Sequence, residues 1–407
     1  MAIEVSIYSN EVSIYPKNDE ILIAMNIQYT KSVFKVLLIA LSLAWVAGCS
    51  TLAKRNNTGV VVARRAQIRS STAVVAADLL EVTRGDSVDI LEFQDVQDPT
   101  DNSKKERWLR VQAHDDDSTE GWIESRNVMP DEVLQSSKKL AEEDKNVPPQ
   151  AMGQLRASSN LRLGPDRTGN ENIMMRLDSG SSFEIVGWKR VPKPKSSEAI
   201  ESDIAPKAGS AQPGNNRGNR DSQEENEPEE TNELWYKVRL DTSSSPAPGG
   251  WIYGKQVELK VPSDIIFYRT GREFVAWQRL DGESVESDGS KTKDAGKEAK
   301  PGSWVILEKS SSNQPHNIGE PDFDRIYVLG YDKRDQEHYT AYRSPDLKGF
   351  LPCRVEGRAD NKTFTIRVQD ENGQINDVQY GIYKDTRGYL KVSAPNTPSK
   401  EKDKRKR

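Results

Sequence analysis

The chain has 407 residues, and 58 lysine and arginine residues stand against 63 aspartate and glutamate residues. The length allows two or three domains of about 150 residues each. The acidic balance argues against a nucleic-acid partner, because nucleic-acid binders present basic stripes. The two cysteines and three histidines do not form the closely spaced pairs of a zinc site, so the sequence predicts no metal and no cofactor.

The first 48 residues have the composition of an export signal behind an acidic preamble. Residues 1–24 carry four carboxylates against Lys17, whereas a signal begins with positive charge, so this segment is interpreted as a non-native extension. In residues 25–48, Lys31 and Lys35 precede an uncharged apolar run. The run is too short to span a bilayer, which needs about 20 apolar residues, and residues 25–48 are therefore predicted to be a signal peptide.

The signal ends on Val46-Ala47-Gly48-Cys49, which resembles the lipobox of bacterial lipoproteins. The resemblance implies lipidation of the Cys49 thiol, cleavage before it and anchoring in a membrane by acyl chains. Ser50 stands where an aspartate would imply retention at the inner membrane, so the periplasmic face of the outer membrane is favoured. The alternatives are a plain secreted signal or a membrane anchor with an incidental cysteine. If Cys49 is acylated, Cys353 is alone and no intramolecular disulfide forms.

Residues 60–129 contain short β-rich runs between turn formers. Val88–Phe93 and Trp108–Val111 are typical strands, and Arg84-Gly85-Asp86 supplies a turn before the first of them. Residues 130–149 predict a helical spacer that Pro148-Pro149 ends. The apolar stripe of this helix is thin, so we expect it to be largely exposed.

Residues 152–260 repeat the pattern of the first block. The repeat runs through the segments Ser159–Asp166, Leu177–Gly180, Phe183–Trp188, Trp235–Leu240 and Gly250–Ile252, which match Ala66–Ser70, Arg84–Asp86, Val88–Leu91, Trp108–Val111 and Gly121–Ile123. This succession resembles the bacterial SH3 (SH3b) domain. The second copy holds Asn160, Leu161, Arg162, Gly164 and Pro165 in register, whereas the first copy departs from the family at this loop. The composition of residues 190–233 predicts a disordered insertion in the second copy.

The resemblance implies two small barrels, and in many members recognition of peptidoglycan. Trp235, Tyr236, Trp251 and Tyr253 are the candidate ligand-binding residues, because amphipathic aromatics are common at binding surfaces. In so small a barrel, however, these aromatic residues belong first of all to the core, and the structural interpretation is favoured. Both interpretations stay open at this point.

Residues 262–395 form a third block in which short strands follow one another without a helical pattern. The expected strands are Ile265–Tyr268, Glu273–Arg279, Ser303–Glu308, Arg325–Tyr331, His338–Arg343, Gly349–Glu356, Thr363–Gln369, Ile375–Tyr383 and Tyr389–Val392. We expect an antiparallel meander that closes into a barrel or a sandwich. The overall fold class is therefore all-β. Residues 396–407 are expected to be a basic disordered tail, which is either simply solvated or in contact with anionic lipid or wall polymer.

The chemistry-bearing residues predict no catalytic site. His114 lies in an acidic turn, residues 114–120, which is typical of solvated surface. His338 and Cys353 lie on nearby expected strands, yet neither lies at a helix start or on a glycine-rich elbow, where nucleophiles are activated.

The preferred hypothesis is a non-catalytic envelope lipoprotein whose paired SH3b domains bind cell-wall peptide, peptidoglycan or an envelope protein. The alternatives are a small-ligand carrier or an enzyme in the third block, or a purely structural partner of an envelope complex. An enclosed cavity in residues 262–395 would favour the carrier.

Overall fold

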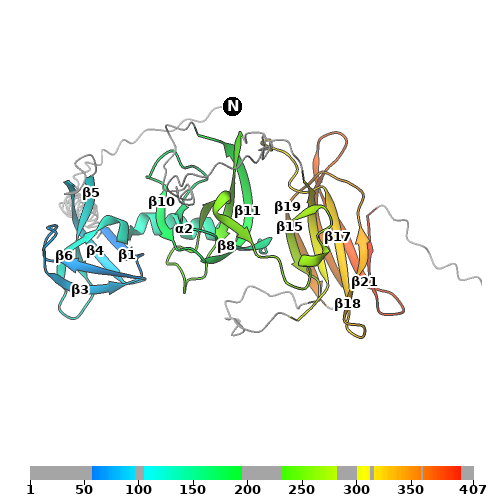
Figure 1. The fold of residues 1–407 in the computed structure, drawn as a ribbon, viewed down its shortest axis with the longest axis horizontal. Coiled ribbons are helices and arrows are strands. Elements are labelled where there is room, and N and C mark those ends of the chain that lie inside the picture. Colours follow the sequence, from blue (N-terminus) through cyan, green and yellow to red (C-terminus); the bar gives the residue numbers. More distant parts are fainter. Residues whose placement is uncertain are drawn as a thin grey trace, which may run out of the picture. The chain divides into compact units, whose positions relative to one another are not determined.

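The computed structural model describes residues 57–97, 105–194, 231–281, 300–311, 316–358 and 361–395. The predicted extension, the signal with Cys49, most of the insertion 190–233 and the tail 396–407 lie outside these residues. The described part of the chain is all-β, as the sequence predicted, with one α-helix (Figure 1).

The first sheet consists of seven antiparallel strands, and their order across the sheet is β3-β2-β6-β5-β4-β1-β7. The strands are β1 (Asn57–Val61), β2 (Arg65–Arg69), β3 (Asp78–Thr83), β4 (Ser87–Gln97), β5 (Lys105–Ala113), β6 (Glu120–Glu124) and β7 (Val128–Pro130). Alternate residues of β1, β2 and β6 are buried, and Val61, Ile68 and Ile123 form part of a closed apolar core. The two strands expected here lie within β4 and β5.

The second sheet repeats this order position by position as β10-β9-β13-β12-β11-β8-β14. Its strands are β8 (Ala151–Leu155), β9 (Ser159–Arg162), β10 (Ile173–Leu177), β11 (Ser182–Pro192), β12 (Asn232–Arg239), β13 (Gly249–Tyr253) and β14 (Val257–Leu259). The register repeats as well, because Arg69 pairs with Trp122 in the first sheet and Arg162 pairs with Trp251 in the second. Each sheet also has a 3-10 turn before its last strand, η1 (Ser125–Asn127) and η3 (Gly254–Gln256).

The helix α2 (Asp131–Glu143) joins the two sheets and is more than the exposed spacer that its thin apolar stripe suggested. The buried Ser137 hydroxyl donates to the carbonyl of Gly249 at 2.6 Å and accepts from its N–H at 3.2 Å. A Cβ at Gly249 would lie 3.0 Å from the backbone nitrogen of Ala141, so any other residue would require the helix to move by a few tenths of an ångström. The helix is thereby fixed on β13.

The third block is a sandwich of two four-stranded antiparallel meanders. Of the two expected forms, a barrel or a sandwich, it therefore adopts the sandwich. One sheet holds β15 (Arg272–Arg279), β16 (Trp304–Ser310), β17 (Arg325–Asp332) and β18 (Glu337–Arg343), and the other holds β19 (Gly349–Arg358), β20 (Asn361–Gln369), β21 (Ile375–Lys384) and β22 (Leu390–Ser393). Buried side chains from both sheets, among them Val305, Val328, Phe364 and Ile366, fill the space between them.

The strand expected at Ile265–Tyr268 is wrong, because Ile266–Tyr268 is the 3-10 turn η4. The carbonyl of Pro262 accepts the N–H groups of both Ile265 and Ile266 at 3.1 Å, which curls this stretch into a turn. An apolar run of four residues has no period that distinguishes a strand from a helical turn.

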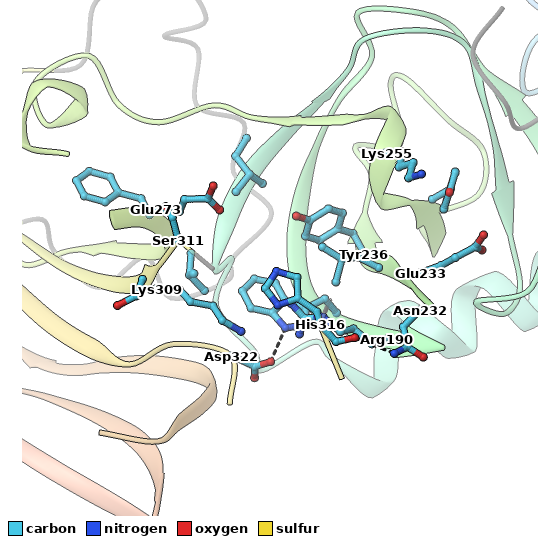
Figure 2. Close-up of a pocket in the computed structure, with 17 residues that line it drawn as sticks. Arg190, Asn232, Glu233, Tyr236, Lys255, Glu273, Lys309, Ser311, His316 and Asp322 are labelled. Carbon is cyan, nitrogen blue, oxygen red and sulfur yellow. Dashed lines mark hydrogen bonds between the residues drawn. The ribbon is translucent and has the colours of Figure 1, made fainter. Parts of the chain in front are cut away.

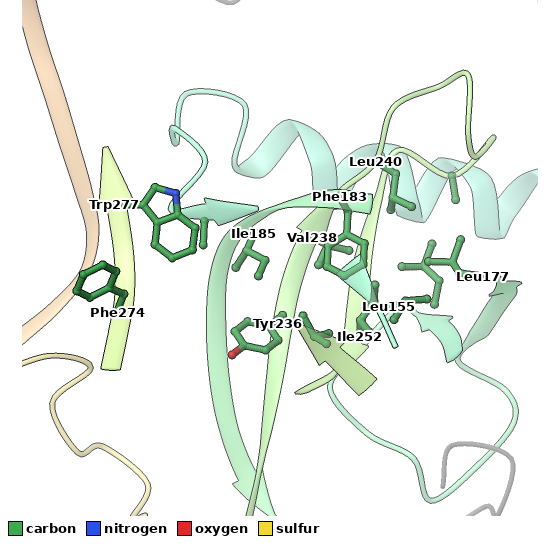
Figure 3. Packing of buried hydrophobic residues seen from close by; sticks show 14 of the residues in the cluster. Leu155, Leu177, Phe183, Ile185, Tyr236, Val238, Leu240, Ile252, Phe274 and Trp277 are labelled. Carbon is green, nitrogen blue, oxygen red and sulfur yellow. The ribbon is translucent and has the colours of Figure 1, made fainter. Parts of the chain in front are cut away.

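The second sheet and the sandwich share one apolar core. Phe274 and Trp277 of β15 belong to the same buried cluster as Ile185 and Tyr236 of the second sheet (Figure 3). Trp304, Ile306 and Leu329, from neighbouring strands of the sandwich, extend this cluster. The boundary that the sequence places near residue 261 is therefore not a boundary in the packing.

One buried polar residue, Gln150, joins the two parts at this core. Its side-chain amide accepts from the N–H of Cys353 at 2.7 Å and donates to the carbonyl of Cys353 at 3.0 Å. Its backbone N–H donates to the carbonyl of Ile185, and its backbone carbonyl accepts from the N–H of Trp277. Gln150 thus connects β11, β15 and β19 by hydrogen bonds that water does not reach.

Replacing Gln150 with alanine is expected to lower the free energy of unfolding by about 2–3 kcal/mol, because it leaves the N–H and C=O of Cys353 buried without partners. Urea denaturation of the variant and of the wild type measures this difference in stability. The matched control is Gln154→Ala, since the amide of Gln154 makes an exposed hydrogen bond to Gly180. The control is expected to change stability by less than about 0.5 kcal/mol. Equal effects at the two positions would contradict the role assigned to Gln150.

Candidate functional site: a cleft beside the second sheet

A cleft of about 310 Å³ lies where the second sheet meets β15 and β16 (Figure 2). One wall comes from β11, β12, β13, η3 and β14, and the other comes from the sandwich and the segment that holds His316 and Asp322. The volume is at the lower end of the range for small-molecule sites, about 300–1,000 Å³.

The structure separates the four aromatic residues that the sequence singled out. Tyr236 and Tyr253 line the cleft. Trp235 is completely buried, with its ring 5.5 Å from that of Tyr253, so it supports the wall and is not accessible to a ligand. Trp251 is half-buried and does not line the cleft.

Trp188 and Arg190 also line the cleft, from β11, and neither is singled out by the sequence. The pairing of β11 with β12 shifts register between Ile185 and Gly187, and such a bulge changes which residues of a strand face one side. Trp188 and Arg190 lie two positions apart after this bulge and therefore face the same side. A bulge leaves no clear signal in the sequence, so these residues were not predicted.

Trp188 is held in place from two sides. Its indole N–H donates to a carboxylate oxygen of Asp322 at 2.6 Å, and its ring meets that of Tyr236 edge-on at 6.0 Å (Figure 2). The other carboxylate oxygen of Asp322 accepts from the N–H of Leu351. Asp322 therefore couples an aromatic wall of the cleft to the sandwich.

Further charged groups of the cleft are used within the protein. Glu233 and Arg167 form a buried ion pair with a shortest distance of 2.5 Å, and the Arg167 guanidinium lies over the ring of Tyr253 at 5.2 Å. Lys309 donates to the carbonyl of Pro321 and forms an ion pair with Glu320 at 3.2 Å. These pairs hold the walls in place.

The Tyr236 hydroxyl makes no hydrogen bond within the described residues, and 8 % of the residue's surface is exposed. It points into the cleft (Figure 2). Burial raises the pKa of Tyr236 to about 12. The phenol therefore keeps its proton at neutral pH and can both donate and accept a hydrogen bond to a ligand.

The remaining candidates lie elsewhere and have separate partners. His114 pairs with Asp89 at 3.3 Å, and the carboxylate of the neighbouring Asp115 caps the N–H and hydroxyl of Thr119, as in a structured surface turn. His338 hydrogen-bonds the carbonyl of Gly302, while Cys353 is buried in the sandwich core. The structure gives His338 and Cys353 no common contact.

No group of three metal-ligating side chains converges within the described residues. None of the helices in those residues combines the length and the apolar character needed to cross a bilayer.

Comparison with known proteins identifies no family. No family model matches the chain, and no curated protein matches it. Two solved structures from Trichomonas vaginalis were found at a TM-score of 0.14, NlpC2 at 8 % identity and NlpC1 at 10 % identity. The matches cover 84 % of this chain and 94 % of NlpC2, and 83 % of this chain and 87 % of NlpC1. Likenesses at this TM-score carry no argument about fold or function.

The Cys353 thiol is expected to resist labelling in the native protein, because burial raises its pKa to about 12 and leaves almost no reactive thiolate at pH 8. A Cys49→Ser protein treated with Ellman's reagent at pH 8 measures this directly. We expect no release of chromophore in buffer and one equivalent after unfolding in denaturant. Rapid native labelling would show that the thiol is accessible and would reopen a nucleophilic role.

Proposed function

We propose that the protein is a non-catalytic envelope lipoprotein that binds cell-wall peptide through a pair of SH3b-like domains. Residues 57–130 and 151–259 form these domains, and the principal ligand site is the cleft of the second. The acyl anchor at Cys49 places the protein on a membrane, with the periplasmic face of the outer membrane as the proposed location. An envelope protein is the competing ligand, which the experiment below separates.

The observation that carries the proposal is the cleft on the second copy of a repeated barrel-like sheet. Its lining combines the aromatic rings of Trp188, Tyr236 and Tyr253 with the Tyr236 hydroxyl, which makes no hydrogen bond to another described residue. Aromatic side chains with a polar edge suit peptide, because they offer contact area to side chains and hydrogen bonds to the backbone.

The first copy has the same strand order but differs at the loop after β2. There the side chain of Arg69 donates to the carbonyls of Val74 and Ala76, and Val74 and Val75 point outward, with 73 % and 93 % of their surface exposed. In the second copy the corresponding loop sends Arg167 inward to Glu233. The two copies therefore present different surfaces, and the proposal assigns the peptide site to the second.

In this proposal the third block supports the site and carries no separate ligand-binding or catalytic site. Buried side chains of both sheets share one apolar core, in which the rings of Phe364 and Tyr380 stack at 4.7 Å, and this packing favours a structural core over a small-ligand carrier. His338 and Cys353 have separate surroundings, which disfavours a Cys–His nucleophile.

Mature protein that carries Cys49→Ser is expected to co-sediment with purified sacculi at low salt, because the cleft and not the acyl anchor recognises the wall. The measurement compares bound and free protein after centrifugation. Sacculi stripped of protein with detergent and protease should bind as well as unstripped envelope. Binding that is lost on stripping would assign the ligand to an envelope protein, and no binding to either preparation would remove the wall from the proposal.

A further inference from the structure

Three charged side chains at the cleft make no ion pair or hydrogen bond with another described residue. They are Arg190 on β11, Lys255 in η3 and Glu273 on β15. This distinguishes them from Asp322, Lys309 and Glu233, which stabilise the walls. Charged groups gathered at a cleft without internal partners are available to a ligand.

These charges are separated by sign between the two walls. Arg190 and Lys255 belong to the second sheet, whereas Glu273 belongs to the sandwich (Figure 2). The Tyr236 hydroxyl points into the same cleft from β12 (Figure 2). Among the described residues, the cleft thus offers two unpaired cations on one side, one unpaired anion on the other and a phenol in its lining.

Apolar side chains share the lining of the cleft with these charges. Leu234, Leu259 and Val275 line it together with the buried ring of Phe274. A ligand that fits must therefore carry a negative group and a positive group, separated by a short stretch that tolerates apolar contact. The volume of about 310 Å³ limits this ligand to a few residues.

We propose that the cleft binds a short zwitterionic peptide, with its carboxylate at Arg190 and Lys255 and its ammonium group at Glu273. The Tyr236 hydroxyl hydrogen-bonds the peptide between these ends. This inference rests on the proposed function, because it names the chemistry of the ligand at the same site. It also makes the sandwich a part of the binding site, since Glu273 is contributed by β15.

The test uses the tripeptide Ala-Leu-Ala as the probe, in three forms: free at both ends, amidated at the C-terminus and acetylated at the N-terminus. Titration of the mature Cys49→Ser protein, followed by calorimetry, gives the affinity of each. We expect each block to weaken binding about tenfold or more, which corresponds to about 1.4 kcal/mol. Equal affinity for all three forms would overturn the proposal.

Variants assign each end of the peptide to its wall. Arg190→Ala is expected to weaken the free peptide about tenfold and to reduce the difference between the free and amidated forms, and adding Lys255→Ala should abolish that difference. Glu273→Gln should abolish the difference between the free and acetylated forms and leave the response to amidation intact. The matched controls are Lys189→Ala and Glu258→Gln, which change exposed charges on β11 and β14 that do not line the cleft. Variants that weaken all three forms equally would show a structural effect and overturn the assignment.

The tripeptide titrations and the sedimentation with sacculi can fail independently of each other. If the protein sediments with stripped sacculi but Arg190→Ala and Glu273→Gln sediment equally well and the tripeptide does not bind, the wall is a ligand and this cleft is not its site. If the tripeptide binds with the expected selectivity and sacculi do not, the cleft chemistry holds and the wall assignment fails.

Discussion

The side-chain amide of Gln150 is the interaction on which the arrangement of the second sheet and the sandwich depends. The amide hydrogen-bonds both the N–H and the carbonyl of Cys353, as a neighbouring strand would. The backbone of Gln150 hydrogen-bonds Ile185 and Trp277. A buried amide is stable only when its polar atoms find partners, so it tolerates few alternative positions of the surrounding strands. The apolar cluster around it supplies the driving force, and Gln150 selects the geometry.

The cleft is a consequence of that geometry. Its two walls come from parts of the chain that a shared core holds together, with Phe274 and Trp277 packed among residues of the second sheet. Asp322 adds a second link, because it binds the indole of Trp188 and the backbone of Leu351 at once. Arg190 and Glu273 are thereby held on opposite walls and do not pair with each other. In the proposed complex, the ligand supplies the opposite charge for each of them.

Much of the local structure was predictable, and the site mostly was not. Turn residues and β-branched runs identified the eight strands of the sandwich but missed the strands β1, β3 and β7 of the first sheet and their counterparts in the second, while the repeated order of short motifs anticipated two sheets of like topology. The four-residue run at Ile265 gave no period, and it folded as a turn. Tyr236 and Tyr253 were anticipated as possible ligand contacts because amphipathic aromatics occur at surfaces. Arg190 and Glu273 were not, since a bulge in β11 orients the first and packing between distant segments brings up the second.

The common core also bears on how this architecture can evolve. A sequence built from recognisable blocks suggests that each block could be transferred to another protein. A segment that ends near residue 260, however, would expose the apolar face of the second sheet that Phe274 and Trp277 cover. Recombination at that point would yield two fragments, each with an exposed apolar face. The second repeat and the sandwich are therefore expected to be stable only together, because each covers apolar surface of the other.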